Sequence, residues 1–339
     1  MTEARAEHHP DGEPLNTDRP DHGYGAEHRR ASLLRDWRLK VAVQTLLGWL
    51  PQSEQMNYRF QRHVTKTLPI SDAELAGQVA KARRNVDAFR RLDPTPLSDA
   101  HLYEFGVGWD LLMPFVYYSM GVERQTVIDL KPLARPDLMR DIATRLTEAA
   151  RVLKLLRSPI LPRGERSTRE LAASCGIEYR APADARAVDL ESGSIAMVTS
   201  CDVLEHVPVD AIGAVLMECR RVLSDDGILR IRIDYQDHYW YFDHRISPYN
   251  FLSFDERRWR RFNPPLHYQN RLRHDAFIDL VRQAGWAVIE DDHHEPSAED
   301  LRVLGTVPLA AGFREAPLER LAIRYANLTL RKATAAEPR

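Results

Sequence analysis

The stretch YEFGVGWDL, from Tyr103 to Leu111, places two glycines one residue apart and a carboxylate two residues before the first of them. Gly106 and Gly108 stand between an apolar segment and a helical pattern, so a ligand can approach the backbone next to a helix N-terminus. Glu104 adds a negative charge to the same loop. A carboxylate repels a pyrophosphate and attracts an ammonium group. The stretch therefore favours a ligand that carries a positive charge.

The known phosphate-binding motifs are incomplete in this loop. The third glycine of GxGxxG would fall at Leu111, and the lysine of a P-loop is absent. A nicotinamide-dependent oxidoreductase uses a similar sheet and is kept as an alternative, but the missing glycine and the Glu104 carboxylate argue against it. S-adenosylmethionine carries an ammonium group, a sulfonium, a ribose and an adenine, and it is the cofactor that we predict.

Two further acids follow at the ends of expected strands. Asp129, the third residue of VIDL, lies 23 positions after Gly106 at the end of the expected second strand, where an acid can accept hydrogen bonds from ribose hydroxyls. Asp184, in APADA, can accept a hydrogen bond from an adenine amino group. Each acid alone can equally be an ordinary turn residue, so the inference depends on their order along the chain.

Two histidines are candidates for accepting a proton, because histidine titrates near neutral pH. His238 in YQDHYW, with Asp237 and Asp243 nearby, is the first candidate, and His206 in LEHV is the second. Either one can instead be a structural histidine. Asp237, His238, Asp243 and His244 also have the atoms of a metal site, but nothing in their spacing makes them converge. We therefore predict no metal site.

Strands and helices alternate from His101 onward, which is typical of an α/β fold. Strands are expected at 101–106, 126–130, 177–181, 194–200, 228–235, 286–291 and 322–331. Helices are expected at 110–120, 136–156, 168–175, 209–223 and 274–284. Asp110 is expected to cap the first of these helices, and Gly227 to make a tight turn before the fifth strand.

The chain divides into three expected parts. Residues 1–30 are polar and rich in Pro, Gly, His and Asp, which predicts a disordered tail. Residues 31–95 predict a helical extension, including a capping box from Ser71 to Glu74. Its arginines and acids are mixed, which favours a cap or packing role over a membrane surface, while a homodimer face stays open. Residues 96–334 predict the α/β domain, with an insertion at 236–273.

Aromatic residues are concentrated in this insertion. Eleven of them lie between Tyr235 and Tyr268, in a segment too long for an ordinary connection. Such a density favours a pocket wall or a lid, and aromatic faces suit sugar rings, planar groups and a sulfonium cation. A hydrophobic cluster beneath a long insertion is the alternative.

Composition limits the class of protein. The chain has 339 residues, of which 44% are hydrophobic and 28% charged, so it can form an ordinary core. Its formal net charge of −2 gives no bulk attraction to nucleic acid. Cys175, Cys201 and Cys219 form no CxxC pair, which fits a reducing cytoplasm. No stretch approaches the roughly 20 apolar residues of a membrane span.

Five stretches, in the expected order, resemble the class I S-adenosylmethionine-dependent methyltransferases, especially those with a type 11 methyltransferase domain: EFGVG, VIDL, ADA, TSCDVLEHV and RRVLSDDGILRI. The resemblance covers about residues 100–235. It implies a Rossmann-like, mostly parallel seven-stranded sheet with an antiparallel edge strand. It departs at Asp110, where the family often has a third glycine.

The resemblance also implies roles for individual residues. Glu104, Gly106 and Gly108 would hold the methionine end of the cofactor, Asp129 its ribose, and Asp184 with Ala185 its adenine, while Ser200 and Cys201 would line the pocket. The predicted activity is methyl transfer to a small-molecule or saccharide acceptor, at oxygen, in which the protein supplies proximity and a histidine base. N- or C-methylation of a small metabolite, and a non-catalytic cofactor-binding protein, are the alternatives.

Overall fold

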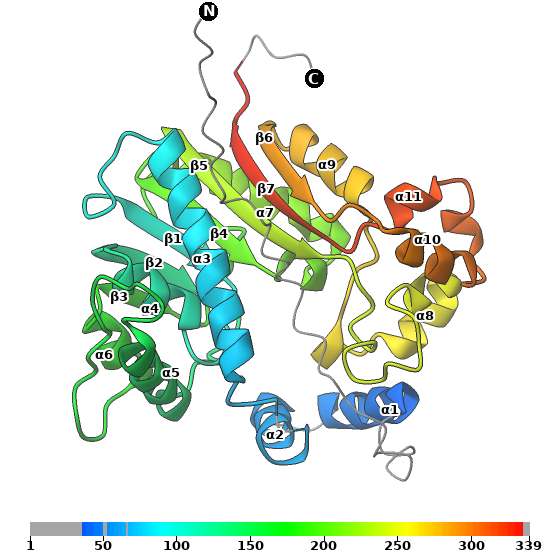
Figure 1. Ribbon diagram of the computed structural model, residues 1–339, viewed down its shortest axis with the longest axis horizontal. Helices are drawn as coiled ribbons and strands as arrows, with labels where there is room; N and C mark the ends of the chain where they lie inside the picture. Colours follow the sequence, from blue (N-terminus) through cyan, green and yellow to red (C-terminus); the bar gives the residue numbers. More distant parts are fainter. Residues whose placement is uncertain (1–35, 50–52, 66, 335–339) are drawn as a thin grey trace, which may run out of the picture.

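A seven-stranded sheet forms the centre of the protein (Figure 1). The structure is a computed structural model that describes residues 36–49, 53–65 and 67–334, so the predicted tail at 1–30 lies outside the described residues. The strands are β1 (His101–Phe105), β2 (Arg124–Ile128), β3 (Ile177–Arg180), β4 (Ile195–Cys201), β5 (Leu223–Asp234), β6 (Trp286–His293) and β7 (Tyr325–Lys332).

The strand order is β3-β2-β1-β4-β5-β7-β6. Neighbouring strands from β3 to β5 pair in parallel. Strand β7 runs antiparallel to β5 on one side and to the edge strand β6 on the other. The predicted mostly parallel, Rossmann-like α/β fold is confirmed. Because β1 and β4 are neighbours whose crossovers run to opposite sides, the sheet has a topological switch point there, which is where such sheets bind ligands.

Helices surround this sheet. The α-helices are α1 (Trp37–Gly48), α2 (Ser53–Phe60), α3 (Asp72–Leu92), α4 (Leu112–Ser119), α5 (Pro136–Ala149), α6 (Thr168–Ala173), α7 (Val209–Val222), α8 (Glu256–Phe262), α9 (His274–Gln283), α10 (Ala298–Gly305) and α11 (Leu318–Leu321). Shorter helical turns are η1 (Gln61–Thr65), η2 (Leu204–His206), η3 (Asn250–Ser253), η4 (Pro265–His267) and η5 (Ala311–Phe313). Within the described part of the chain, no helix combines the length and the apolar character needed to cross a membrane.

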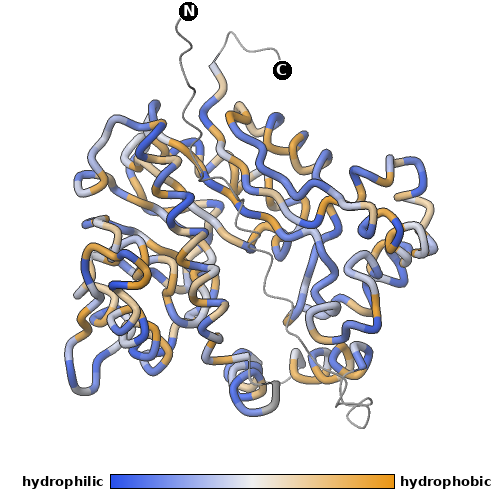
Figure 2. The backbone as a smooth tube through the Cα atoms, viewed as in Figure 1, coloured by the Kyte–Doolittle hydropathy of each residue, from blue (hydrophilic) through white to orange (hydrophobic). Residues whose placement is uncertain are grey.

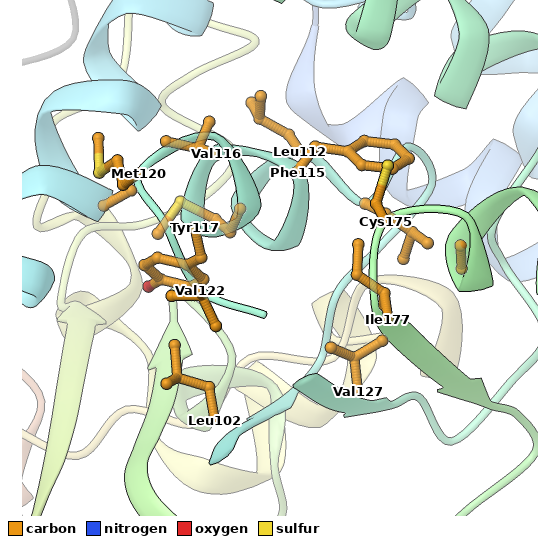
Figure 3. Packing of buried hydrophobic residues seen from close by; sticks show 14 of the residues in the cluster. Leu102, Leu112, Phe115, Val116, Tyr117, Met120, Val122, Val127, Cys175 and Ile177 are labelled. Carbon is orange, nitrogen blue, oxygen red and sulfur yellow. The ribbon is translucent and has the colours of Figure 1, made fainter. Parts of the chain in front are cut away.

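The two faces of the sheet each carry a hydrophobic core, because successive strand residues point to opposite sides. On one face, Leu102 and Val127 pack with buried residues of α3, α4, α5 and α6 (Figure 3). On the other face, Tyr103 and Ile128 pack with α7 and α9. Figure 2 shows the resulting pattern, with hydrophobic residues alternating with hydrophilic ones along the elements. The sheet is therefore covered on both sides and is a rigid support for its strand ends.

A third core joins the N-terminal helix α1 to the segment after β5. Trp37 of α1 packs against Tyr239, with ring centroids 5.5 Å apart, and against Phe254 at 6.0 Å. The backbone N–H of Trp37 donates to Asp243 Oδ2 at 3.2 Å. Tyr249 and Phe251 of the insertion are also buried in this core. These aromatic residues therefore belong to a hydrophobic cluster rather than to a pocket wall.

Some expected boundaries need correction. No tight turn precedes β5 at Gly227, because β5 already begins at Leu223 and residues 224–227 form an irregularity in its pairing with β4. A Cβ at Gly227 would lie 2.8 Å from the carbonyl oxygen of Ala196, so the close strand approach accounts for the glycine. The capping box at Ser71 and Glu74 is present at the start of α3, as predicted.

Candidate functional site

A cavity of about 280 Å³ opens beyond the carboxyl ends of β1, β2 and β4. Five of the residues singled out by the sequence line it: Gly106, Asp129, Asp184, Ala185 and His206. Apolar side chains such as Phe105 and Ile128 form much of the remaining wall. The parallel strands bring these residues together although they are far apart in the sequence, as expected for a ligand site of this fold.

The glycine loop forms one side of the cavity. Gly106 has a positive φ of 78°, and a Cβ there would lie 2.4 Å from Val203 Cγ2, so both its conformation and its surroundings require glycine. Gly108 also has a positive φ, of 70°, but nothing lies within 4 Å of the position of its missing Cβ. The loop is thus packed tightly at its first glycine and has open space at its second.

Asp129 connects this loop to the second strand. Its Oδ2 accepts a hydrogen bond from the Gly108 backbone N–H at 3.1 Å. The residue is 8% exposed, and burial raises the pKa of its carboxyl. A carboxylate held at the rim of the cavity suits the hydroxyl groups of a ribose.

Asp184 lies on the third strand's side of the cavity. Its carboxylate accepts hydrogen bonds from Arg186 Nε and Nη2, the latter at 2.6 Å. These bonds to Arg186 hold the pKa of Asp184 below its usual value. The side chain is half-buried and stays ionised, so it is a fixed acceptor beside Ala185 in the cavity wall.

Glu104 is the most unusual acid of the set. It is 4% exposed, and its Oε2 is buried with no hydrogen-bond partner. Burial raises the pKa of its carboxyl to about 8. A buried acceptor without a donor is costly unless a ligand satisfies it. The ammonium of S-adenosylmethionine supplies both the donor and the charge, so the residues present fit this cofactor.

Four of the predicted cofactor residues do not line the cavity: Glu104, Gly108, Ser200 and Cys201. The Ser200 hydroxyl donates to the Phe105 carbonyl at 3.4 Å, within the sheet. The Cys201 Sγ lies 3.9 Å from Asn85 Nδ2 of α3. Neither residue is among those that line the 280 Å³ cavity. Their predicted contact with the cofactor therefore stays a prediction.

The start of α4 differs from the expectation. The helix begins at Leu112, and the capping position is Leu111 in a left-handed conformation with φ of 55° rather than Asp110. Asp110 still satisfies a free backbone donor, because its Oδ1 accepts from the Leu112 N–H at 3.1 Å. The Asp110 carboxylate thus lies one residue before the capping position, because the loop makes an additional turn at Leu111.

Helix α2 covers the outer side of the loops that follow β1 and β2. The ring of Tyr58 lies 5.4 Å from that of Trp109, and the Arg135 guanidinium lies over both rings. Arg135 N also donates to the Trp109 carbonyl at 2.8 Å. Arg62 and Tyr58 both bond to Asp137 Oδ2. The glycine loop is thus held between the sheet and the N-terminal helices.

A second cluster lies where β5 ends. Asp234 Oδ2 accepts from the Tyr241 hydroxyl at 2.6 Å and lies 3.5 Å from His238 Nε2. Against the effect of burial, His238 and Arg232 lower the pKa of the Asp234 carboxyl. Asp234 is therefore an ionised partner that can orient the His238 ring. The sequence indicates Asp237 and Asp243 as the acids that act on His238. This prediction is wrong, because both carboxylates bond to other groups.

Asp237 and Asp243 bond elsewhere. Asp237 accepts from Asn250 Nδ2 at 3.0 Å, and Asp243 accepts from the Trp37 N–H and from Arg245. His244 lies against Trp240, with ring centroids 5.0 Å apart. The four residues considered as a metal site therefore do not converge.

The two candidate bases do come together. The rings of His206 and His238 have centroids 4.8 Å apart. His206 Nδ1 lies 2.7 Å from the Tyr268 carbonyl oxygen, and since a carbonyl only accepts, Nδ1 carries the proton and Nε2 keeps a lone pair. Because His206 also lines the cavity, the histidine pair lies next to the cofactor site.

Sequence reasoning missed two residues of this region. Glu205 is 3% exposed, and burial together with Asp202 and Asp234 raises the pKa of its carboxyl well above its usual range. It stands directly before His206 in TSCDVLEHV, so its place in that motif was a usable signal. Asp234 is the last residue of β5, the same kind of position that identified Asp129.

Residues 163–231 match a family model described as "Methyltransferase domain". No curated protein matches the sequence.

Among solved structures, similarity is found to 1,6-didemethyltoxoflavin-N1-methyltransferase of Burkholderia thailandensis, at 14% identity over 83% of this chain and 87% of that one, with a TM-score of 0.43. A Galdieria sulphuraria protein described as a sarcosine dimethylglycine methyltransferase is 14% identical over 77% and 88% of the two chains, with a TM-score of 0.43. An S-adenosylmethionine-dependent methyltransferase of Mesorhizobium loti is 12% identical over 73% and 96%, with a TM-score of 0.40.

The identification rests on two observations. The family model matches the segment that contains β3, β4, α7 and most of β5. The strand order, with β7 antiparallel between β5 and β6, is that of the class I fold expected from the sequence. Residues 163–231 therefore match a methyltransferase domain, and the sheet around them has the strand order of the class I methyltransferase fold, for which S-adenosylmethionine is the expected cofactor.

Proposed function

We propose that the enzyme methylates a hydroxyl group of a small-molecule or saccharide acceptor. The observation that carries this proposal is the His206–His238 pair, which shares His206 with the cofactor cavity and has Asp234 behind His238. A hydroxyl needs a proton acceptor during methyl transfer, whereas a neutral amine or thiolate does not need one at this position.

Six of the predicted residues hold the cofactor in this proposal. Glu104 faces the ammonium group, the backbone at Gly106 and Gly108 accommodates the methionine portion, and Asp129 accepts from the ribose. Asp184 and Ala185 form the adenine end. The bound cofactor supplies a methyl group on a positively charged sulfur. The open space at Gly108 and the unpartnered Glu104 Oε2 support this arrangement.

The chain's own residues then position the acceptor and take its proton. His238, oriented by Asp234, is the first candidate for the proton acceptor, and His206 is the second. Trp240, Tyr241 and Phe242 are only partly buried near His238, so they offer aromatic surface to an acceptor. Helix α1 supplies Lys40, whose Nζ lies 5.2 Å from the centre of the Phe242 ring.

An acceptor screen with labelled S-adenosylmethionine tests the proposal. The screen should include sugars, phenols and aliphatic alcohols, with amines and thiols as the competing classes. For a hydroxyl acceptor, His238→Gln should lower turnover by roughly 10²- to 10⁴-fold, the usual effect of removing a general base, and change cofactor affinity little. Exclusive methylation of amines, or full turnover in both His238→Gln and His206→Ala, would contradict the proposal.

A further inference from the structure

Three potential metal ligands converge beside the cofactor cavity. Glu205, His206 and His238 each offer one ligand atom, and these atoms lie within 4.8 Å of one another. Glu205 and His206 belong to η2, directly after β4, while His238 follows β5. The cluster therefore arises because β4 and β5 are parallel neighbours that end at the same edge.

The Glu205 carboxyl has no partner of its own. Its Oε1 and Oε2 are both buried without a hydrogen bond. The nearest other acids are already engaged, since Asp202 bonds to Lys81 at 2.8 Å and to Arg232, and Asp234 bonds to Tyr241. Buried carboxylates are normally hydrogen-bonded, paired with a cation or coordinated to a metal. Glu205 thus has two acceptor atoms available for a cation.

The ring of His206 is held as that of a metal-binding histidine usually is. The Nδ1–H of His206 donates to the Tyr268 carbonyl, which fixes the ring and leaves Nε2 as a ligand atom. The backbone N–H of His238 donates to Gln269 Oε1 at 3.2 Å, and its ring lies beside the Asp234 carboxylate. A carbonyl that accepts from the second ring nitrogen, as at His206, is a common contact of a ligating imidazole.

We propose that Glu205, His206 and His238 bind a divalent cation that favours nitrogen and oxygen ligands, such as Zn²⁺ or Co²⁺. Two imidazoles and one carboxylate leave further coordination positions open, whereas Mg²⁺ and Ca²⁺ prefer oxygen ligands alone. Ligand atoms of a tetrahedral zinc site lie about 3.3 Å apart, given metal–ligand distances near 2.0–2.1 Å. The ligand atoms, now within 4.8 Å of one another, must therefore approach by up to about 1.5 Å when the cation binds.

Cation binding goes beyond the proposed function and does not rest on it. An imidazole nitrogen that binds a cation has no lone pair for a proton. The cation-bound protein and the protein with a free histidine base are consequently two separate states. Binding can be measured without any turnover, so its absence would leave the methyl-transfer proposal untouched.

The test uses the full chain after removal of metal by a chelator. Zn²⁺ is titrated by calorimetry, and Co²⁺ by visible absorption, which reports the coordination geometry. The background protein has His8, His9, His22 and His28 replaced by Ala, because these histidines near the N-terminus offer unrelated ligands. We expect one equivalent of Zn²⁺ with a dissociation constant in the micromolar range or below.

Three variants locate the cation. Glu205→Gln, His206→Ala and His238→Ala should each weaken Zn²⁺ binding at least tenfold. The matched control is His293→Ala, since His274, Asp291 and His293 form a second group of converging ligands in the described residues. In that group His274 Nε2 already bonds to Asp291 Oδ2 at 2.9 Å.

Two results would overturn the inference. One is the absence of stoichiometric binding at submillimolar Zn²⁺ in the background protein. The other is loss of binding in His293→Ala while Glu205→Gln binds normally. Calorimetry with S-adenosylmethionine shows whether each variant is folded, and at least one folded variant of the three decides the question.

Discussion

Replacing Glu104 by Gln should change the pH dependence of stability more than any other single substitution at the cofactor site. Burial raises the pKa of Glu104 from 4.5 to about 8 in the folded protein. Between these values the folded state binds a proton that the unfolded chain has lost. Stability therefore falls as pH rises through this window, and it becomes independent of this group above pH 8.

The magnitude follows from the shift. One pKa unit corresponds to 1.36 kcal/mol, so the wild type should lose about 2.5 kcal/mol between pH 5 and pH 7 through this carboxyl alone. Glutamine resembles the protonated acid in shape and does not titrate. Without ligand, Glu104→Gln should thus be more stable than the wild type by roughly 3 kcal/mol at pH 7, and by less than 1 kcal/mol at pH 5.

Urea unfolding at pH 5, 6 and 7, followed by circular dichroism, measures this difference. Glu165→Gln, at an exposed position, is the control and should leave the pH dependence unchanged. If the free energies of unfolding of Glu104→Gln and the wild type differ by the same amount at pH 5 and pH 7, the raised pKa is wrong.

Binding of the cofactor provides a second measurement on Glu104→Gln. An ammonium placed against Glu104 favours the ionised carboxylate, so binding of S-adenosylmethionine at pH 7 should release close to one proton. Calorimetry in buffers with different ionisation enthalpies counts released protons. Glu104→Gln should release almost none and bind more weakly above pH 7. Equal proton release in both proteins would place the ammonium elsewhere.

Three further substitutions test the surroundings of the cofactor. Asp129→Asn should weaken S-adenosylmethionine binding roughly 10- to 100-fold by calorimetry, the effect of losing charge-assisted hydrogen bonds, while the exposed Asp189→Asn should not. Gly106→Ala should lower the free energy of unfolding in urea by at least about 2 kcal/mol, because residue 106 has a positive φ and the new Cβ would clash with Val203. Adding Val203→Ala should recover part of the loss. Full stability of Gly106→Ala alone would contradict the clash. Ser71→Ala should cost about 1 kcal/mol through loss of the capping box, and an unchanged midpoint would show that the cap is dispensable.

The sequence predicted the sheet well, because apolar alternation within each strand and acids at the strand ends are visible in short segments. Alternating apolar residues locate β1, and Asp129, directly after the second strand, indicates a ligand position. The type of chemistry followed from Glu104, since a buried carboxylate beside a glycine loop excludes phosphates more clearly than a missing glycine does. The prediction of the cofactor thus depended on the charge and position of single residues, whose roles stay predictions.

Contacts between distant segments were not predictable in the same way. Asp237 and Asp243 were proposed to act on His238, but the acid beside its ring is Asp234, four residues earlier at the end of β5. Glu205 reaches His238 from the turn after β4, and this contact between distant segments has no local signal. The aromatic residues of the insertion could equally line a pocket or fill a core. The packing of Trp37 against Tyr239 shows that these aromatic residues fill a core. No local sequence pattern predicts this contact.

The third core also has a consequence for the order of folding. The bond between Trp37 and Asp243 joins residues 206 positions apart, whereas most walls of the cofactor cavity come from residues 105–215. Contacts that close long loops lose more chain entropy before they gain stability, so they form late. We expect amide hydrogens of α1 and residues 239–254 to exchange faster than those of β1 and β4. The third core would then open and close on a sheet that is already complete.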